Sequence, residues 1–240
     1  MVVAAPEDTE DAEGTAERVY RELLMLAAKL RLPQILRIWQ YLPRITAPQG
    51  SENRYQRYCA GRQIALAKAG YSPRAFPAAC LLDNQGDQLI LYALLSATPG
   101  VQIENPRQVS AFHYPRIYGR VAPSFSRALA LRGAEQSRLY ISGTASVVGH
   151  ASRHTSVEDQ IEETLVNLEL LLESAIPYCP RARQGLGAII PLKVYLRNRE
   201  DYPQSRAQLA ARLPAEHPVI YLKANACREN LLVEMEGEIG

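Results

Sequence analysis

The chain has 240 residues, 47% of them hydrophobic and 22% charged, which is an ordinary composition for a folded globular protein. Its formal net charge is only +2, which argues against a dedicated nucleic-acid-binding protein with a strongly basic surface. No stretch approaches the roughly 20 consecutive apolar residues that a membrane-spanning helix needs, so we expect no membrane partner. The four cysteines are widely spaced without a CxxC pair, which predicts reduced thiols and a cytoplasmic protein.

The first third of the chain is predicted to be mainly helical. Residues 1–14 are acidic and lack the basic and apolar regions of a signal peptide, so we expect a flexible lead-in there. Apolar residues recur at helical spacing over 19–30, which predicts a first helix. Pro33 ends it and opens a second predicted helix over 34–41. A third helix is expected over 53–69, with Gly70 as its C-terminal cap.

Strand signals follow in the middle of the chain. Residues 78–82 and 88–95 are predicted strands on either side of a turn at 83–86 (DNQG). The segment 96–125 is rich in Pro, Gly, Tyr and Arg and shows little periodicity. A stretch of this kind is either a linker or a functional loop.

The last 105 residues alternate strands and helices. Strands are expected over 138–142, 188–196, 218–223 and 231–238. A long helix should follow the capping box at 155–158 (TSVE), and a short one is predicted over 204–213. This order predicts an α+β fold with helices packed on one face of a sheet.

Arginines and tyrosines cluster in two segments, 53–62 (NRYQRYCAGR) and 113–127 (HYPRIYGRVAPSFSR). The planar guanidinium group binds a carboxylate through two charge-assisted hydrogen bonds, and tyrosine adds a donor on a rigid ring. One interpretation is a pocket for a small anion with more than one carboxylate. The alternative is a set of solvated surface arginines over packed tyrosines.

The closing strand places Leu232, Glu234 and Glu236 on one face, because side chains alternate along a strand. A buried carboxyl group there would have a raised pKa and could donate a proton near neutral pH. The alternative is an edge strand with its acidic face in water.

Two further motifs carry weaker signals. His150 and His154 are four residues apart and could bind zinc on a helix, but no third ligand is evident. The small residues of 142–149 could let a ligand approach the backbone, yet no GxGxxG pattern supports a nucleotide. We expect no metal and no cofactor.

Several of these segments resemble known families. The strand at 139–145 (LYISGTA) and the closing VEME at 233–236 are similar to a RidA/YjgF-type domain. The segments that resemble the chorismatase family, which includes FkbO-like enzymes and hydroxybenzoate synthases, are 53–62, 114–119, 123–125 and 142–150. This resemblance covers about residues 16–240.

The resemblance implies a RidA/YjgF-like (chorismate-mutase-like) mixed sheet with helices on one face, preceded by a shortened, largely helical first half. We expect the first half at 1–110, without the strands that usually begin it, and a catalytic domain at 111–240. One departure is that Arg120 directly follows Gly119, where the family has a proline and then an arginine.

The resemblance also implies residue roles. Glu234 lies where the family has its proton donor, and a cysteine at the position of Cys227 is a mark of the branch that makes 3-hydroxybenzoate. Ala145 points instead to the branch that hydrolyses chorismate to a cyclohexadiene diol. The residues expected to contact substrate are Arg54, Tyr55, Arg62, Tyr114, Arg116, Tyr118, Ala145 and Glu236.

The predicted function is therefore conversion of chorismate to pyruvate and a hydroxybenzoate, most simply 3-hydroxybenzoate, by protonation of the enolpyruvyl group. The alternatives are hydrolysis to the diol and a non-catalytic RidA-like binding protein. Imine deamination of the RidA type has little support, because residues 218–223 contain no arginine. The small molecule chorismate is the expected partner, and the expected state is a monomer or a homotrimer.

Overall fold

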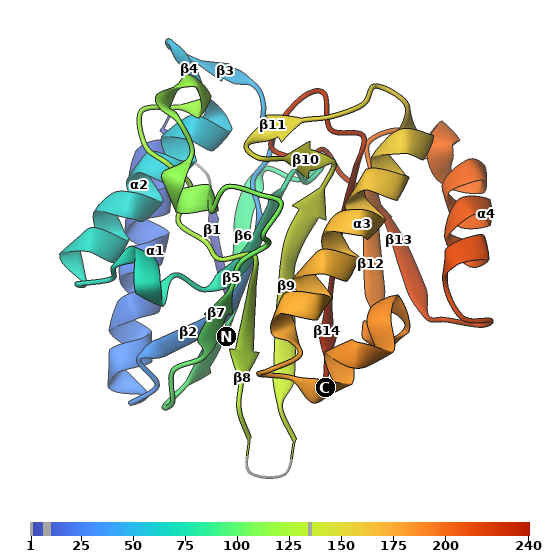
Figure 1. Cartoon of the computed structure of the whole chain (residues 1–240). Helices are drawn as coiled ribbons and strands as arrows, with labels where there is room; N and C mark the ends of the chain where they lie inside the picture. The colour runs from blue at the N-terminus through green and yellow to red at the C-terminus, as the bar shows by residue number, and fades with distance from the viewer. Residues whose placement is uncertain (1, 7–10, 134–135) are drawn as a thin grey trace.

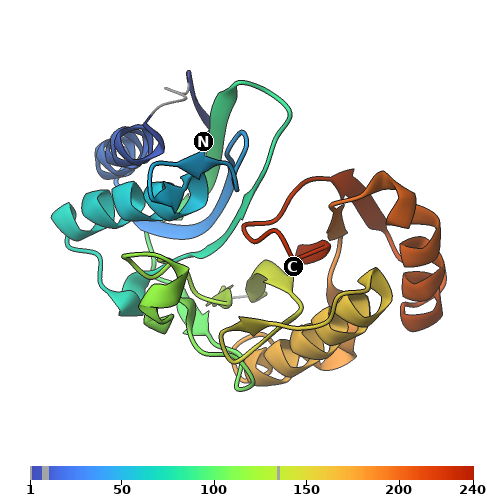
Figure 2. The same ribbon diagram turned by 90° about the horizontal axis from the view of Figure 1, so that it is seen from above.

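Two mixed sheets, each covered by helices on its outer side, form the computed structural model (Figure 1). The structure describes residues 2–6, 11–133 and 136–240. Figure 2 shows α1 and α2 on the outer side of the first half, and α3 and α4 on the outer side of the second. Within the described part of the chain, no helix has the length and apolar character needed to cross a membrane.

The first half is built around a four-stranded sheet in the order β1-β6-β2-β5. Strands β2 and β5 are parallel, and the other two pairs are antiparallel. Its elements are β1 (Val2–Pro6), α1 (Ala12–Lys29), β2 (Gln34–Tyr41), β3 (Pro48–Gln49), β4 (Glu52–Asn53), α2 (Arg54–Lys68), the 3-10 helix η1 (Pro73–Ala75), β5 (Ala78–Leu82) and β6 (Gln88–Ser96). The buried faces of α1 and α2 pack on this sheet around Tyr20, Leu23 and Ile38.

Two predictions for this half are corrected. Residues 34–41 form strand β2 and not a helix. The pairing of β2 shifts register between Ile35 and Arg37, so Ile35 and Ile38 reach the same core although they are three residues apart. A β-bulge thus produces an apolar spacing that resembles that of a helix. The flexible lead-in over 1–14 is also wrong in part, because β1 and the start of α1 lie within it; residues 7–10 lie outside the described residues.

The predicted helix at 53–69 is confirmed as α2, and the strands at 78–82 and 88–95 are confirmed as β5 and β6. Asn53 caps α2 through a complete capping box with Gln56. The two strands do not pair with each other across their turn. β5 pairs with β2, and β6 lies between β1 and β2.

The second half contains a six-stranded sheet in the order β13-β12-β14-β9-β8-β7. Its elements are β7 (Val101–Ile103), the 3-10 helices η2 (Ala111–His113) and η3 (Arg116–Tyr118), β8 (Ala128–Leu131), β9 (Arg138–Ala145), β10 (Val147–Val148), β11 (Ala151–Ser152), α3 (Val157–Ala175), η4 (Pro180–Ala188), β12 (Leu192–Leu196), η5 (Arg199–Asp201), α4 (Tyr202–Arg212), β13 (Val219–Lys223) and β14 (Val233–Ile239). The order of helices and strands confirms the predicted α+β class. Strand β7 joins this sheet although it precedes residue 111, and the division at residue 110 stays a prediction.

Helix α3 covers one face of this sheet. Ser156 is its N-cap, at the second residue of the predicted capping box. Val233 and Met235 of β14 lie in the core beneath α3. Because side chains alternate along β14, Glu234 and Glu236 lie on the opposite face, towards the first half.

The two halves meet where β5 lies against β9. The Ser142 hydroxyl accepts a hydrogen bond from the Ala79 backbone N–H (2.9 Å) and donates one to the Ser126 carbonyl (2.5 Å). A short parallel bridge between Ala78 and Ser126 adds to the contact. The junction holds the acidic face of β14 opposite β2 and β5.

Candidate active site

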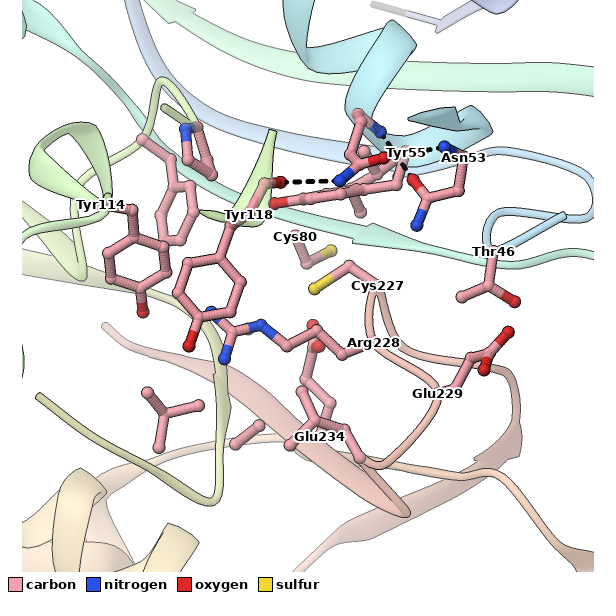
Figure 3. Close-up of a pocket in the computed structure, with 18 of the residues that line it drawn as sticks. Thr46, Asn53, Tyr55, Cys80, Tyr114, Tyr118, Cys227, Arg228, Glu229 and Glu234 are labelled. Carbon is pink, nitrogen blue, oxygen red and sulfur yellow. Dashed lines mark hydrogen bonds between the residues drawn. The ribbon is translucent and has the colours of Figure 1, made fainter. Parts of the chain in front are cut away.

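A cavity of about 690 Å³ lies between the two halves. Its walls come from the ends of β2, β4 and β5, the start of α2, the loop carrying η2 and η3, and the segments that precede β10 and β14. Figure 3 shows Glu234, Cys227 and Cys80 on one side, near Arg228 and Tyr118. The predicted site residues that line the cavity are Tyr55, Arg62, Tyr114, Tyr118, Ala145, Cys227 and Glu234.

Glu234 is the carboxyl group at the floor of this cavity. It is 6% exposed and belongs to β14, which lies between β12 and β9 and not at an edge. Burial raises the pKa of Glu234 to about 7, even though the positive charges of Arg37 and Arg127 act in the opposite direction. In the described chain, no hydrogen bond to another side chain or to the backbone holds this carboxyl group. It can therefore exchange a proton with a ligand near neutral pH.

Gly143 provides the space for that carboxyl group. A Cβ atom at this position would lie 1.9 Å from Glu234 Oε1, far inside van der Waals contact. Residue 145, an alanine, is paired with Glu234 across β9 and β14. The small residues of 142–149 therefore make room for the side chain of Glu234 beside strand β9.

Glu236 has different surroundings, although it lies only two residues further along β14. It is 1% exposed and forms an ion pair with Arg37. It also accepts hydrogen bonds from Tyr195 Oη (2.6 Å), Trp39 Nε1 (2.8 Å) and Lys193 Nζ (3.3 Å). Because hydrogen-bond donors and positive charges surround its oxygens, Glu236 is stabilised as the ionised carboxylate. Glu236 does not line the cavity, so the structure does not place it where a substrate contact was expected.

Two thiols lie beside Glu234. Burial, together with the nearby charge of Glu234, raises the pKa of Cys227 to about 12. Burial likewise raises the pKa of Cys80 to about 11. Both groups are therefore neutral thiols at physiological pH, and they give this side of the cavity a weakly polar wall.

Three arginines supply positive charge. Arg62 is buried among tyrosines of the first half, and its Nη2 donates to Cys59 Sγ (3.5 Å). Arg127 donates to Tyr114 Oη (2.7 Å) and to the Val109 carbonyl (2.9 Å). Of the described atoms, none accepts a hydrogen bond from the Nε of Arg62 or of Arg127, so each has a free donor.

Arg228 is the third. Its guanidinium carbon lies 4.0 Å from the centre of the Tyr118 ring, and its Nη1 donates to the His150 carbonyl (2.9 Å). Stacking and this hydrogen bond fix the orientation of the charge. Guanidinium groups held in this way can bind carboxylates without reorganisation.

Two predicted arginines lie elsewhere. Arg116 is exposed on η3 and does not line the cavity, whereas its neighbours Tyr114 and Tyr118 do. Arg54 is buried, and its Nε donates to the Pro43 carbonyl (3.1 Å), so it supports the turn before α2. The arginine cluster thus divides between the cavity, the surface and the core.

The two histidines do not face a common ligand. The His150 Nδ1 atom lies 3.2 Å from Tyr118 Oη, whereas His154 Nε2 lies 3.0 Å from a Glu163 carboxyl oxygen. Each therefore has its own partner, and the pair is better described as part of the loop structure around the cavity.

Four residues of the site are not identified by the sequence alone: Arg127, Arg228, Cys80 and Gly143. Arg127 belongs to the arginine-rich segment 113–127 and Gly143 to the small-residue segment 142–149, so the sequence carries a weak signal for both. Arg228 follows Cys227 directly, but nothing in the local pattern distinguishes it from a surface arginine. The position of Arg228 becomes clear only in the structure, where the 224–232 segment lines the cavity.

Known proteins match this chain over nearly its full length. Residues 1–95 match the N-terminal domain of FkbO/Hyg5-like chorismatases. A chorismatase from Streptomyces rapamycinicus is 36% identical, over 99% of this chain and 73% of the relative. A 3-hydroxybenzoate synthase from Streptomyces hygroscopicus is 34% identical, over 92% of this chain and 67% of the relative. The chain belongs to the chorismatase family.

A solved chorismatase structure agrees with this membership. A chorismatase crystal structure superposes with a TM-score of 0.92 at 32% identity, covering 100% of this chain and 73% of that one. A Rid-family protein from Yersinia pestis superposes with a TM-score of 0.45 at 18% identity, covering 59% of this chain and 98% of that one.

Proposed function

We propose that this protein releases pyruvate from chorismate, with Glu234 as the proton donor. The observation that carries the proposal is a buried carboxyl group, with its pKa raised to about 7 by burial, on a cavity lined by three arginines. Chorismate has two carboxylates and an enol-ether side chain, so it needs both cations and an acid. Relatives of this chain are named chorismatase and 3-hydroxybenzoate synthase.

The chemistry begins when Glu234 transfers its proton to the terminal CH2 carbon of the enol ether. A C–H bond forms, and positive charge develops on the ether carbon. Water or a ring hydroxyl then attacks that carbon, and collapse of the adduct breaks the bond between the ring oxygen and the ether carbon. Pyruvate leaves, and the attacking O–H group returns a proton to Glu234. The diol product consumes one water. For the aromatic acid, the C–O bond of the former ring hydroxyl and one ring C–H bond also break, so that this oxygen leaves with pyruvate or as water, and no water is consumed overall.

Three guanidinium groups are candidates for binding the two substrate carboxylates: Arg62, Arg127 and Arg228. The free Nε donors of Arg62 and Arg127 and the stacked plane of Arg228 support this assignment. Arg116, an exposed residue, is not part of it. Fixed charges of this kind orient the substrate before proton transfer.

The ring product we propose is 3-hydroxybenzoate, because the thiol of Cys227 lines the cavity beside Glu234. The diol remains the second candidate, since Ala145 lies next to Glu234. A non-catalytic binding protein is disfavoured by the protonatable acid in the cavity. We further propose a cytoplasmic location, supported by four free cysteines among the described residues, and a monomer or homotrimer that needs no cofactor.

The variant Glu234→Gln tests the proton donor. It keeps the size and polarity of the side chain and removes the acid, so pyruvate release should fall by roughly 10²–10⁴-fold while chorismate still binds. Pyruvate is measured with a coupled dehydrogenase assay, and binding by calorimetry. Glu238→Gln on the same strand is the matched control and should keep activity. Pyruvate release near the wild-type rate from Glu234→Gln would refute the proposal.

A further inference from the structure

The two carboxyl groups of β14, Glu234 and Glu236, lie close to a buried positive charge. Arg37 comes from β2 of the first half and is 1% exposed, so its charge is shielded little by water. It lies close enough to Glu234 to lower the pKa of that group. A full positive charge in such a place favours ionised Glu234, which could no longer donate a proton.

Glu236 removes that charge. Its carboxylate forms the ion pair with Arg37, and Lys193 binds its other oxygen at 3.3 Å. Nη2 of Arg37 makes this pair, and among the described residues Nη1 has no hydrogen-bond acceptor, so Glu236 is the carboxylate paired with this guanidinium group. The pair therefore has little net charge in the direction of Glu234, although it lies on the same face of the strand.

Other groups that face Glu234 do not supply a negative charge to oppose Arg37. The groups that face it are Arg37 of β2, Cys80 of β5, Arg127 before β8, Tyr195 of β12 and Cys227 of the 224–232 segment. Lys193 of β12 contacts Glu236 instead. The two thiols and the Tyr195 hydroxyl are neutral at pH 7, because burial raises the pKa of each. None of these described groups is an anion, so the negative charge that opposes Arg37 comes from Glu236.

We infer that Glu236 is a positioning residue: by neutralising Arg37, it allows the neighbouring Glu234 to hold the proton that the reaction uses. This inference rests on the proposed role of Glu234. It also explains why a second acid lies behind the cavity without reaching it. Hydrogen bonds from Trp39 and Tyr195 hold Glu236 in place and keep it ionised.

The pH dependence of kcat/KM for chorismate tests the inference. An acid catalyst must be protonated, so the wild-type rate should be high at low pH and fall as the pH rises through about 7, the pKa of Glu234. In Glu236→Gln the charges of Arg37 and Lys193 are unopposed and favour ionised Glu234. This alkaline limb should then move to lower pH by about one unit, which lowers kcat/KM about tenfold above pH 8.

Three comparisons separate this charge effect from a loss of structure. Trp39→Phe removes a hydrogen bond to Glu236 without changing charge, so the limb should stay in place. The double variant Arg37→Gln with Glu236→Gln removes both charges. Its alkaline limb should return to within a few tenths of a pH unit of the wild-type position. Lys193→Met removes a partly exposed cation and should move the alkaline limb to higher pH. This variant alone tests the inference if Glu236→Gln does not fold.

The carboxyl stretching band of Glu234, followed by infrared difference spectroscopy against pH, gives the same information without turnover. A limb that stays at the wild-type pH in both Glu236→Gln and Lys193→Met would overturn the inference. If Glu234→Gln were inactive at the same time, the proposed function would stand. If Glu234→Gln were active, the proposed function would fail, and the infrared titration would still decide the role of Glu236.

Discussion

Two glutamates on one strand show how surroundings determine chemistry at the scale of a residue. Glu234 has no hydrogen bond from the described residues and a pKa raised to about 7 by burial, whereas Glu236 is held by Arg37, Trp39 and Tyr195. The same residue type therefore provides a proton donor in one place and a fixed anion in the other. Gly143 contributes by leaving room for the donor.

Cys227→Ala should change the product and not the rate of pyruvate release by more than a few fold. Because the pKa of Cys227 is raised to about 12 by burial, its thiol is neutral and does not compete with Glu234 as an ion. Without the thiol, the ring product should shift from 3-hydroxybenzoate to the dihydrodiol, as measured by mass spectrometry. Cys80→Ala, the matched control in the same wall, should keep the product. An unchanged product in Cys227→Ala would reject the role of this thiol.

At the scale of the element, helix α2 links its own cap to the loop that covers the cavity. The Gln56 side chain accepts a hydrogen bond from the Asn53 backbone N–H (2.8 Å) and completes the capping box. The same side chain donates to the Tyr118 carbonyl (3.1 Å) on η3. One residue thus fixes both the start of the helix and the position of Tyr118.

Gln56→Glu should separate these two roles. The carboxylate keeps the acceptor for the helix cap but loses the donor to Tyr118, so the loop at 111–119 should become less ordered. We expect KM for chorismate to rise by roughly tenfold, corresponding to one lost hydrogen bond, with a smaller change in kcat. Gln63→Glu on the exposed face of α2 makes the same charge change and should leave KM unaltered. Equal effects of the two substitutions would exclude the loop contact as the cause.

At the scale of the whole molecule, the site exists because two halves meet. Glu234 and the thiol of Cys227 come from the second half, while Arg62 and Arg37 come from the first. Ser142 connects the halves with two hydrogen bonds at the junction of β5 and β9. Stability and activity should therefore depend on the same contact.

Ser142→Ala should lower the free energy of unfolding by about 1–3 kcal/mol, because the Ala79 N–H and the Ser126 carbonyl lose a buried partner. Urea denaturation measures this change. Ser174→Ala removes a hydroxyl that bonds only within α3, and we expect it to cost less than 1 kcal/mol. Equal stability of the two variants would show that the Ser142 contact does not hold the halves together.

The sequence by itself determined the α+β class, helix α2, strands β5, β6, β9, β13 and β14, and the shared face of Glu234 and Glu236. These features depend on local periodicity and capping, which a linear pattern records. Tertiary structure alone decided that 34–41 is a strand, because a bulge gives it the apolar spacing of a helix. It also decided which arginines reach the cavity and how the two glutamates differ. Burial and charge depend on the segments packed against each residue, and Arg37 and Glu236 are 199 positions apart in the chain.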